Sequence, residues 1–152
     1  RKMNKIPINL SVIINRKKEI NYGIKNISTY VKFAKRVKSS KKKLRKIFLQ
    51  LKNKKKDIIG YGVTAKSTTI LNYCDIGKKF ISYFVDTTKD KQNKYTPGMK
   101  IPIYKYPGFI EKNIDYIFLG AWNFKEEIFK KEKKFIKNGG KFIIHTPIPK
   151  II

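Results

Sequence analysis

The sequence predicts an α/β protein with a Rossmann-like, doubly wound and mainly parallel sheet, helices on both faces, and a long amphipathic helix before it. Short apolar segments alternate with helical segments through the second half of the chain, which is typical of this class. The segment Asp57–Cys74 combines a strand, a glycine turn and a helix. Within it, Gly60, Gly62 and Ala65 occupy the small positions of the G-x-G-x-x-G/A dinucleotide fingerprint.

Composition limits the possible classes of protein. The chain has 152 residues with 41% hydrophobic residues, enough for a folded domain with a core. No apolar run approaches the roughly 20 residues that span a bilayer, so we expect a cytoplasmic protein without membrane contact. A single cysteine, Cys74, excludes an internal disulfide, and with only His145 beside it we expect no metal site.

The charge is strongly positive, with 37 basic against 10 acidic residues and a net charge of +27. Such a chain attracts polyanions, so the rival hypothesis is a basic nucleic-acid-binding module, or a generic nucleotide-binding module without a methyltransferase role. The basic residues are mostly lysines scattered through every segment, whereas base readout favours arginine. We therefore expect only non-specific nucleic-acid binding.

The first 56 residues contain two predicted elements. Residues 8–15 are rich in β-branched side chains and predict a strand, either an extra edge strand or, as we prefer, the last strand of a preceding domain. Residues 1–19 would then be a remnant of that domain or a linker, and residues 20–152 the domain itself. A long helix begins at Ile27, with a break or bend expected near Ser39-Ser40. One face of this helix is apolar, and we expect it to pack on its own core or on a neighbouring domain in preference to a partner helix.

The central unit is predicted as strand 57–60, helix 65–74 and strand 80–85, a right-handed βαβ unit. Asp86 closes the second strand, where such folds place the carboxylate that holds a ribose. It could instead cap N–H groups of its own loop. Lys66 lies in the first helical turn, where it opposes the helix dipole unless an anion lies between, although chance placement explains it equally well.

The remaining elements follow in order. Pro97-Gly98 predicts a type II turn, and 101–104 an edge strand, because Pro102 cannot donate to a ladder. Residues 109–112 predict one helical turn, and 115–121 a buried strand. Asn123 and Glu126 predict a capping box for helix 124–137, which Gly139-Gly140 ends. Residues 141–145 form the last predicted strand, and Pro147 and Pro149 close the sheet.

Ligands of open parallel sheets bind at the carboxyl ends of the strands. The residues predicted there include Thr64, Ser67 and Thr68 as hydroxyl donors. Trp122 offers a ring face, although a structural role is more common for a half-buried tryptophan. His145 also lies at a strand end, but no carboxylate or nucleophile is placed to work with it. We expect no catalytic residue in this chain.

Several motifs in one order resemble the C-terminal domain of the sugar C-methyltransferase family. They cover about residues 20–152 and are, in order, Gly60-Tyr-Gly-Val-Thr-Ala-Lys66, Leu71-Asn-Tyr-Cys74, Val85-Asp86, Lys91-Gln-Asn-Lys-Tyr-Thr-Pro-Gly98, Ile101-Pro-Ile103, Asp115-Tyr116, Ala121-Trp-Asn123, Glu127-Ile128 and Gly139-Gly-Lys-Phe-Ile143. The chain departs from the family pattern at Thr64 and His145, so His145 inherits no role. The resemblance implies a three-part enzyme with a zinc-binding module, a central S-adenosylmethionine-binding domain that carries the catalytic groups, and this Rossmann-like domain.

The resemblance also implies a ligand, a nucleotide-linked keto-deoxysugar that this domain holds for methylation. Together with the strand ends, it gives the expected substrate-binding residues: Gly60, Gly62, Thr64, Ala65, Lys66, Asp86, Tyr95, Thr96, Gly98, Trp122 and Asn123. We expect no cofactor on this segment, S-adenosylmethionine on the full-length enzyme, and no activity without the central domain. We also expect Gly62→Val to abolish nucleotide binding while the fold survives.

Overall fold

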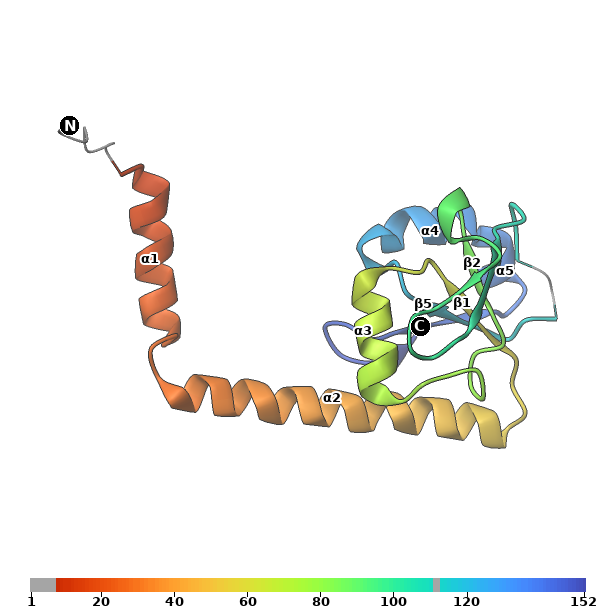
Figure 1. Cartoon of the computed structure of the whole chain (residues 1–152), viewed down its shortest axis with the longest axis horizontal. Coiled ribbons are helices and arrows are strands. Elements are labelled where there is room, and N and C mark those ends of the chain that lie inside the picture. The colour runs from red at the N-terminus through yellow and green to blue at the C-terminus, as the bar shows by residue number, and fades with distance from the viewer. Residues whose placement is uncertain (1–7, 111–112) are drawn as a thin grey trace. The chain divides into compact units, whose positions relative to one another are not determined.

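The computed structural model describes residues 8–110 and 113–152 (Figure 1). Helices and strands alternate after a helical N-terminal region, as the fold class requires. In chain order the elements are α1 (Leu10–Tyr22), α2 (Ile27–Asn53), β1 (Ile58–Tyr61), α3 (Ala65–Cys74), β2 (Phe84–Asp86), the 3₁₀ turn η1 (Lys89–Lys91), β3 (Lys94–Tyr95), β4 (Pro102–Lys105), β5 (Tyr116–Leu119), the 3₁₀ turn η2 (Trp122–Phe124), α4 (Lys125–Lys131), α5 (Lys133–Lys137), β6 (Lys141–Ile144) and β7 (Lys150–Ile151).

The sheet has the strand order β3-β4-β2-β1-β5-β6-β7 in the described part of the chain. The five central strands are parallel, and the short strands β3 and β7 are antiparallel to their neighbours at the two edges. This arrangement confirms the Rossmann-like, mainly parallel sheet that the sequence predicts.

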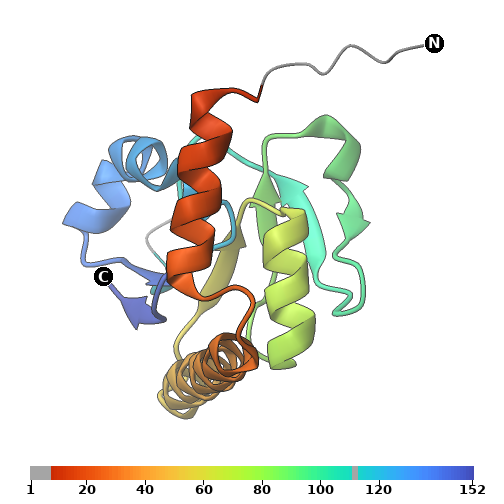
Figure 2. The same cartoon turned by 90° about the vertical axis from the view of Figure 1, so that its left-hand side faces the viewer.

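Two apolar layers cover the faces of this sheet. On one face, Leu44, Phe48 and Leu51 of α2 and Leu71 of α3 pack with strand residues such as Phe118. On the other face, a second cluster combines strand residues with Ile128 of α4 and Phe135 of α5. Figure 2 shows α3 and the pair α4 and α5 in separate layers. The helices therefore lie on both faces, as predicted.

The chain divides into two compact units, Arg1–Ser39 and Ser40–Ile152. In the described part of the first unit no side chain is buried. Twelve large apolar side chains are exposed there, namely Ile8, Leu10, Val12, Ile13, Ile14, Ile20, Tyr22, Ile24, Ile27, Tyr30, Val31 and Phe33. The apolar face of α2 is thus buried only in its second half, at Leu44, Phe48 and Leu51.

The prediction of a strand over residues 8–15 is wrong, because α1 occupies Leu10–Tyr22. The Asn9 side chain accepts a hydrogen bond of 2.9 Å from the Ser11 N–H and caps the helix, and Gly23, with φ 81°, ends it. The preference of β-branched residues for strands is weak, and local capping outweighs it here. The break expected at Ser39-Ser40 is also absent, since α2 runs through both residues.

The edge position predicted for the strand around Pro102 is wrong as well. β4 lies between β3 and β2. Proline fits there because the β3 side of the ladder uses Ile101 and Ile103, which accept bonds from Thr96 N–H and Asn93 N–H. On the other side, β4 pairs with β2 only from Ile103 onward. Neither ladder therefore needs the N–H that proline lacks.

Three further predictions differ from the structure. β2 begins only at Phe84, because Phe80 and Ile81 turn back and donate to Gly77 O. The predicted helix 124–137 is divided at Glu132 into α4 and α5, and neither Asn123 nor any other side chain caps α4. Pro147 and Pro149 do not close the sheet, since β7 returns beside β6.

The helical turn predicted for residues 109–112 is only partly open to comparison. Gly108 and Phe109 form a bend and Ile110 is irregular. Residues 111 and 112 lie outside the described residues. The Pro97-Gly98 turn is present, with φ 77° at Gly98.

Candidate functional site

A cleft of about 270 Å³ opens at the carboxyl ends of β1, β2 and β5. β1 pairs with β2 on one side and with β5 on the other, and the helices that follow β1 and β5 lie on opposite faces. This is the topological switch point at which open α/β sheets bind ligands. The lining residues are Tyr61, Gly62, Thr64, Asp86, Thr87, Thr88, Lys91, Ala121, Phe124, Glu127, Ile128 and Lys131.

The two glycines of the fingerprint are required by packing. Gly60 lies inside β1, and a Cβ there would overlap the ring of Phe84. Gly62 begins the turn with φ 76°, and a Cβ there would lie 2.5 Å from the Cβ of Ala121. Gly62 therefore lets the turn after β1 approach the segment after β5. A substitution at Gly62 would disturb this contact, so our expectation that the fold tolerates Gly62→Val needs correction.

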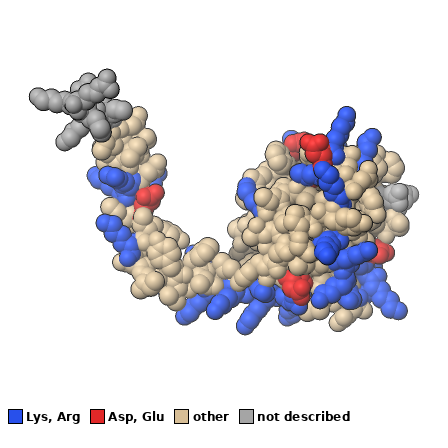
Figure 3. Space-filling view, in the orientation of Figure 1, with Lys and Arg blue, Asp and Glu red and all other residues tan. Residues whose placement is uncertain are grey.

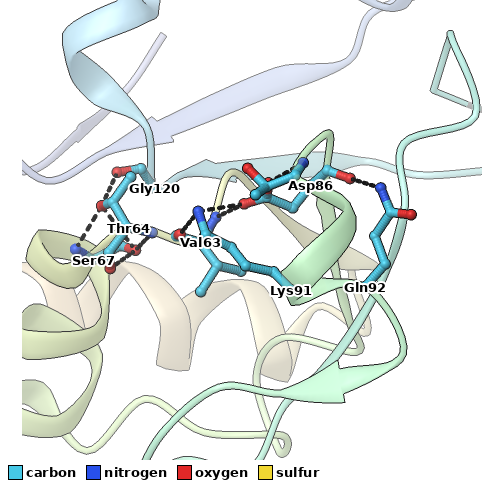
Figure 4. A network of polar contacts seen from close by, with 8 residues as sticks. Val63, Thr64, Ser67, Asp86, Lys91, Gln92 and Gly120 are labelled. Carbon is cyan, nitrogen blue, oxygen red and sulfur yellow. Dashed lines mark hydrogen bonds and ion pairs between the residues drawn. The ribbon is translucent and has the colours of Figure 1, made fainter.

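Asp86 holds the turn after β1 in place, as the contact network in Figure 4 shows. Its Oδ2 accepts a bond of 2.7 Å from the Val63 N–H and lies 3.4 Å from Lys91 Nζ, while Oδ1 accepts 2.8 Å from the Thr88 N–H. The side chain is buried. Burial alone would raise the pKa of Asp86, but the N–H groups of Thr88 and Val63 and the charge of Lys91 outweigh it and lower that pKa below its ordinary value.

Lys91 completes this network and was not among the residues predicted from the sequence. Its Nζ donates a bond of 2.7 Å to Val63 O as well as contacting Asp86. Lys91 comes from η1, five residues after Asp86, so only the fold of that loop brings it back to the turn. Its position in a lysine-rich chain carried no distinguishing signal.

The start of α3 forms the second part of the site. Thr64 and Ser67 make a reciprocal capping box, and Thr64 Oγ1 also lies 3.2 Å from Gly120 O (Figure 4). The N–H groups of Gly62, Val63 and Thr64 are bonded to Val85 O, Asp86 and Ser67 Oγ. Within the described residues, those of Ala65 and Lys66 make no hydrogen bond, which leaves two donors at the positive end of the helix dipole.

A second, wider cleft of about 520 Å³ lies beside the first turn of α3. Thr64 and Lys91 line both clefts, and Tyr95, which is 65% exposed, lines this one. The other lining residues are Val63, Ala65, Thr68, Thr69, Asp90, Lys94, Pro97 and Ile103. Lys91 and Lys94 thus line the same cleft as Ala65, together with the acidic residue Asp90.

The other predicted residues lie apart from the cleft linings. Thr96 is buried, and its Oγ1 accepts a bond from the Ile101 N–H. A Cβ on Gly98 would overlap Asn72, whose side chain donates to Pro97 O. Trp122 is 37% exposed and its ring lies 5.7 Å from Lys66 Nζ. Asn123 is exposed in η2.

His145 is buried beside the ring of Phe118, and neither ring nitrogen has a hydrogen-bond partner among the described residues. Burial lowers the pKa of His145 to about 4, so the ring is neutral at pH 7. The described residues contain no group of three or more His, Cys, Asp or Glu side chains that could hold a metal ion. Over the same residues, no helix has the length and apolarity needed to cross a membrane.

These features define a doubly wound domain with a cleft at its switch point, and the chain belongs to the C-methyltransferase C-terminal domain family, whose model matches residues 2–149. It is also 36% identical over 134 residues to C-methyltransferase NovU of Streptomyces niveus. The matched region is 88% of this chain and 32% of that protein. The chain therefore spans about a third of the length of this relative.

Proposed function

We propose that this chain is the substrate-positioning domain of an S-adenosylmethionine-dependent C-methyltransferase that acts on a nucleotide-linked keto-deoxysugar. The observation that carries the proposal is the cleft at the switch point, which adjoins free N–H groups and lysines at the start of α3. Membership of the C-methyltransferase family supports the link to methyl transfer. By orienting its substrate, such a domain lowers the barrier without supplying a reacting group.

In this proposal the diphosphate lies against the first turn of α3. The N–H groups of Ala65 and Lys66 donate to it, and Lys66 and Lys94 balance its charge. The amides of Gly62, Val63 and Thr64 take no part, because they are bonded within the protein. The ring of Trp122 lies 5.7 Å from Lys66 Nζ, outside the linings of both clefts.

The methyl donor belongs to another part of the enzyme. A nucleoside ribose in this fold class is held by a carboxylate at the end of the second strand. Here both oxygens of Asp86 are already bonded to Val63, Thr88 and Lys91, so this carboxylate does not hold a ribose, neither that of S-adenosylmethionine nor that of the nucleotide-sugar. We therefore expect calorimetry to detect no binding of that cofactor to the chain, and micromolar binding would overturn this assignment.

The partner in this proposal is the S-adenosylmethionine-binding domain, on the same chain or a separate one. The exposed apolar side chains of residues 8–39 offer a surface for it. Eight Lys and Arg residues accompany them against the one acidic residue Glu19, so a second copy of this segment would be repelled. A surface of the partner domain that carries apolar and acidic side chains would complement this segment.

Titration at two salt concentrations tests the proposal against the nucleic-acid rival. Figure 3 shows basic side chains spread over the visible face, so a polyanion would find many weak contacts. Binding of a random DNA duplex should weaken by orders of magnitude between about 50 and 200 mM salt. A nucleotide-sugar such as dTDP-glucose or UDP-glucose should lose far less affinity. If no nucleotide-sugar binds at either salt while the duplex binds tightly, the proposal fails.

A further inference from the structure

A cleft lined by lysines, the basic cleft, lies at the amino ends of β1 and β2, whereas the candidate site lies at their carboxyl ends. It encloses about 300 Å³. Asp57 and Ile58 belong to the start of β1, and Ser82 lies just before β2. None of its lining residues lines the two clefts of the candidate site. The other lining residues are Phe80 and five lysines, Lys52, Lys55, Lys56, Lys78 and Lys79.

Two separate segments supply the positive charge of the basic cleft. Three of the lysines come from residues 52–56, at the end of α2 and in the turn after it, and two from residues 78–79, in the loop after α3. Among the described residues, Asp57 carries the one carboxylate of the lining. Because like charges repel, gathering five lysines around one hollow costs free energy, and an anion in the hollow would offset that cost.

Two of the five lysines are paired with carboxylates outside the lining. Lys56 Nζ lies 2.8 Å from Asp115 Oδ1, and Lys79 Nζ lies 3.5 Å from Asp75 Oδ2. These ion pairs hold the two side chains in place at the rim of the basic cleft.

The remaining three lysines, Lys52, Lys55 and Lys78, form no ion pair in the described part of the chain. The buried ring of Phe80 positions one of them, since Lys52 Nζ lies 5.6 Å from its centroid, and Lys79 Nζ lies 5.3 Å from the same centroid. The basic cleft therefore combines a fixed cationic wall with three lysines whose charge is not balanced by a carboxylate.

The end of α2 does not use up this charge. Lysines near a helix C-terminus can bond to the last carbonyl groups and interact with the helix dipole. Here the backbone N–H groups of residues 54–56 already bond to the carbonyl groups of residues 50–52. The lysine side chains are therefore not needed to cap the helix.

We propose that the basic cleft binds a compact anion that carries several linked phosphate groups, an oligophosphate. A lysine ammonium group binds phosphate as a point charge with three N–H donors, so several lysines around a small volume suit several phosphates in a row. A single phosphate would leave most of these lysines without a counter-charge. The site is separate from the phosphate position at the start of α3, and the inference does not depend on the proposed function.

Calorimetric titration of the full 152-residue chain with inorganic tripolyphosphate tests this inference. The titration is done at about 150 mM salt, where exposed charges are screened beyond about 8 Å. One variant combines Lys52→Gln, Lys55→Gln and Lys78→Gln, which removes three exposed charges and keeps polar side chains. We expect it to bind tripolyphosphate at least about tenfold more weakly than the wild type, because three charge-assisted contacts are lost.

The matched control combines Lys42→Gln, Lys43→Gln and Lys46→Gln. These lysines are exposed on α2 and lie outside the basic cleft, so this variant should bind within about twofold of the wild type. The titrations are repeated with excess dTDP-glucose, which occupies the candidate site if the proposed function is right. Tripolyphosphate should still bind, and inorganic phosphate should bind far more weakly than tripolyphosphate.

Four results would overturn the inference. They are the absence of tripolyphosphate binding to the wild type, equal losses of affinity in the two triple variants, displacement of tripolyphosphate by dTDP-glucose, and equal affinities for inorganic phosphate and tripolyphosphate. Failure of dTDP-glucose to bind would count against the proposed function alone, because the comparison of the two triple variants does not require that ligand.

Discussion

The carboxylate of Asp86 accepts a hydrogen bond of 2.7 Å from the backbone N–H of Val63, and so joins the end of β2 to the turn after β1. Asp86→Ala would leave this buried N–H group without an acceptor and release Thr88 and Lys91. We expect it to lower the free energy of unfolding by about 2–4 kcal/mol in urea titrations. Asp86→Asn keeps one acceptor oxygen and should lose less. Equal stability of Asp86→Ala and the wild type would show that the hydrogen bonds of the Asp86 carboxylate do not stabilise the fold.

Gly62 and Ala121 should behave as a coupled pair. Gly62→Ala places a methyl group against Ala121 and keeps a strained positive φ, so we expect a loss of about 2–4 kcal/mol in the free energy of unfolding. Ala121→Gly in the same chain removes the collision but not the strain, and should restore part of the loss. The measurement is a double-mutant cycle by urea unfolding. Strictly additive effects would mean that the two residues do not meet in solution.

Because His145 is buried and neutral, we expect the protein to lose stability in mild acid. Burial lowers the folded pKa of His145 to about 4 from the ordinary 6.5, so between these values the unfolded chain binds the extra proton. Stability is therefore complete above pH 6.5 and falls as the pH drops toward 4, by up to about 3 kcal/mol.

The check compares the wild type with His145→Leu by urea unfolding from pH 7 to pH 4. Glu132, whose pKa is raised, contributes with the opposite sign, so the difference between the two proteins is the relevant quantity. The variant should lose less stability than the wild type as the pH falls. Parallel curves would mean that the ring is charged and solvated in the folded state.

Lys66 tests the phosphate position without disturbing the fold. Lys66→Ala should weaken nucleotide-sugar binding by about 1–2 kcal/mol, because one charge-assisted contact is lost. Lys133→Ala removes an exposed lysine of α5 that lines neither cleft, and serves as the charge-matched control. Calorimetric titration of both variants measures the loss of nucleotide-sugar affinity. An equal loss of affinity in both would mean that Lys66 contributes only through the overall positive charge.

Two phenylalanines of α2 should respond differently to the same substitution. Phe48 is fully buried against Phe80 and Phe118, and Phe48→Ala should cost about 3–5 kcal/mol of stability. Phe33 is 57% exposed, so Phe33→Ala should change the free energy of unfolding by less than about 0.5 kcal/mol. Thermal and urea unfolding measure both. A large loss for Phe33→Ala would mean that residues 8–39 have a core of their own.

The elements that the sequence predicts correctly are those with strong local signals. Helix 65–74 is matched to the residue, because Thr64 and Ser67 cap it and the turn before it needs glycine. The buried strand 115–121 contains β5, as its continuous apolar run indicates. Where local signals compete, as in residues 8–15, strand propensity gave the wrong element.

In the candidate site, too, features with local signals could be predicted and features that depend on long-range contacts could not. The sequence by itself determined the Rossmann-like class, the family, and the strand ends that carry Gly62, Thr64 and Asp86, because period, turn chemistry and motif order are encoded within short segments. Only the tertiary structure decided that β4 is internal, that Gly62 meets Ala121, and that Tyr106 donates a hydrogen bond to the buried Glu132. Each of these contacts joins segments that are far apart in the chain, and such a contact exists only once the sheet has brought its strands together.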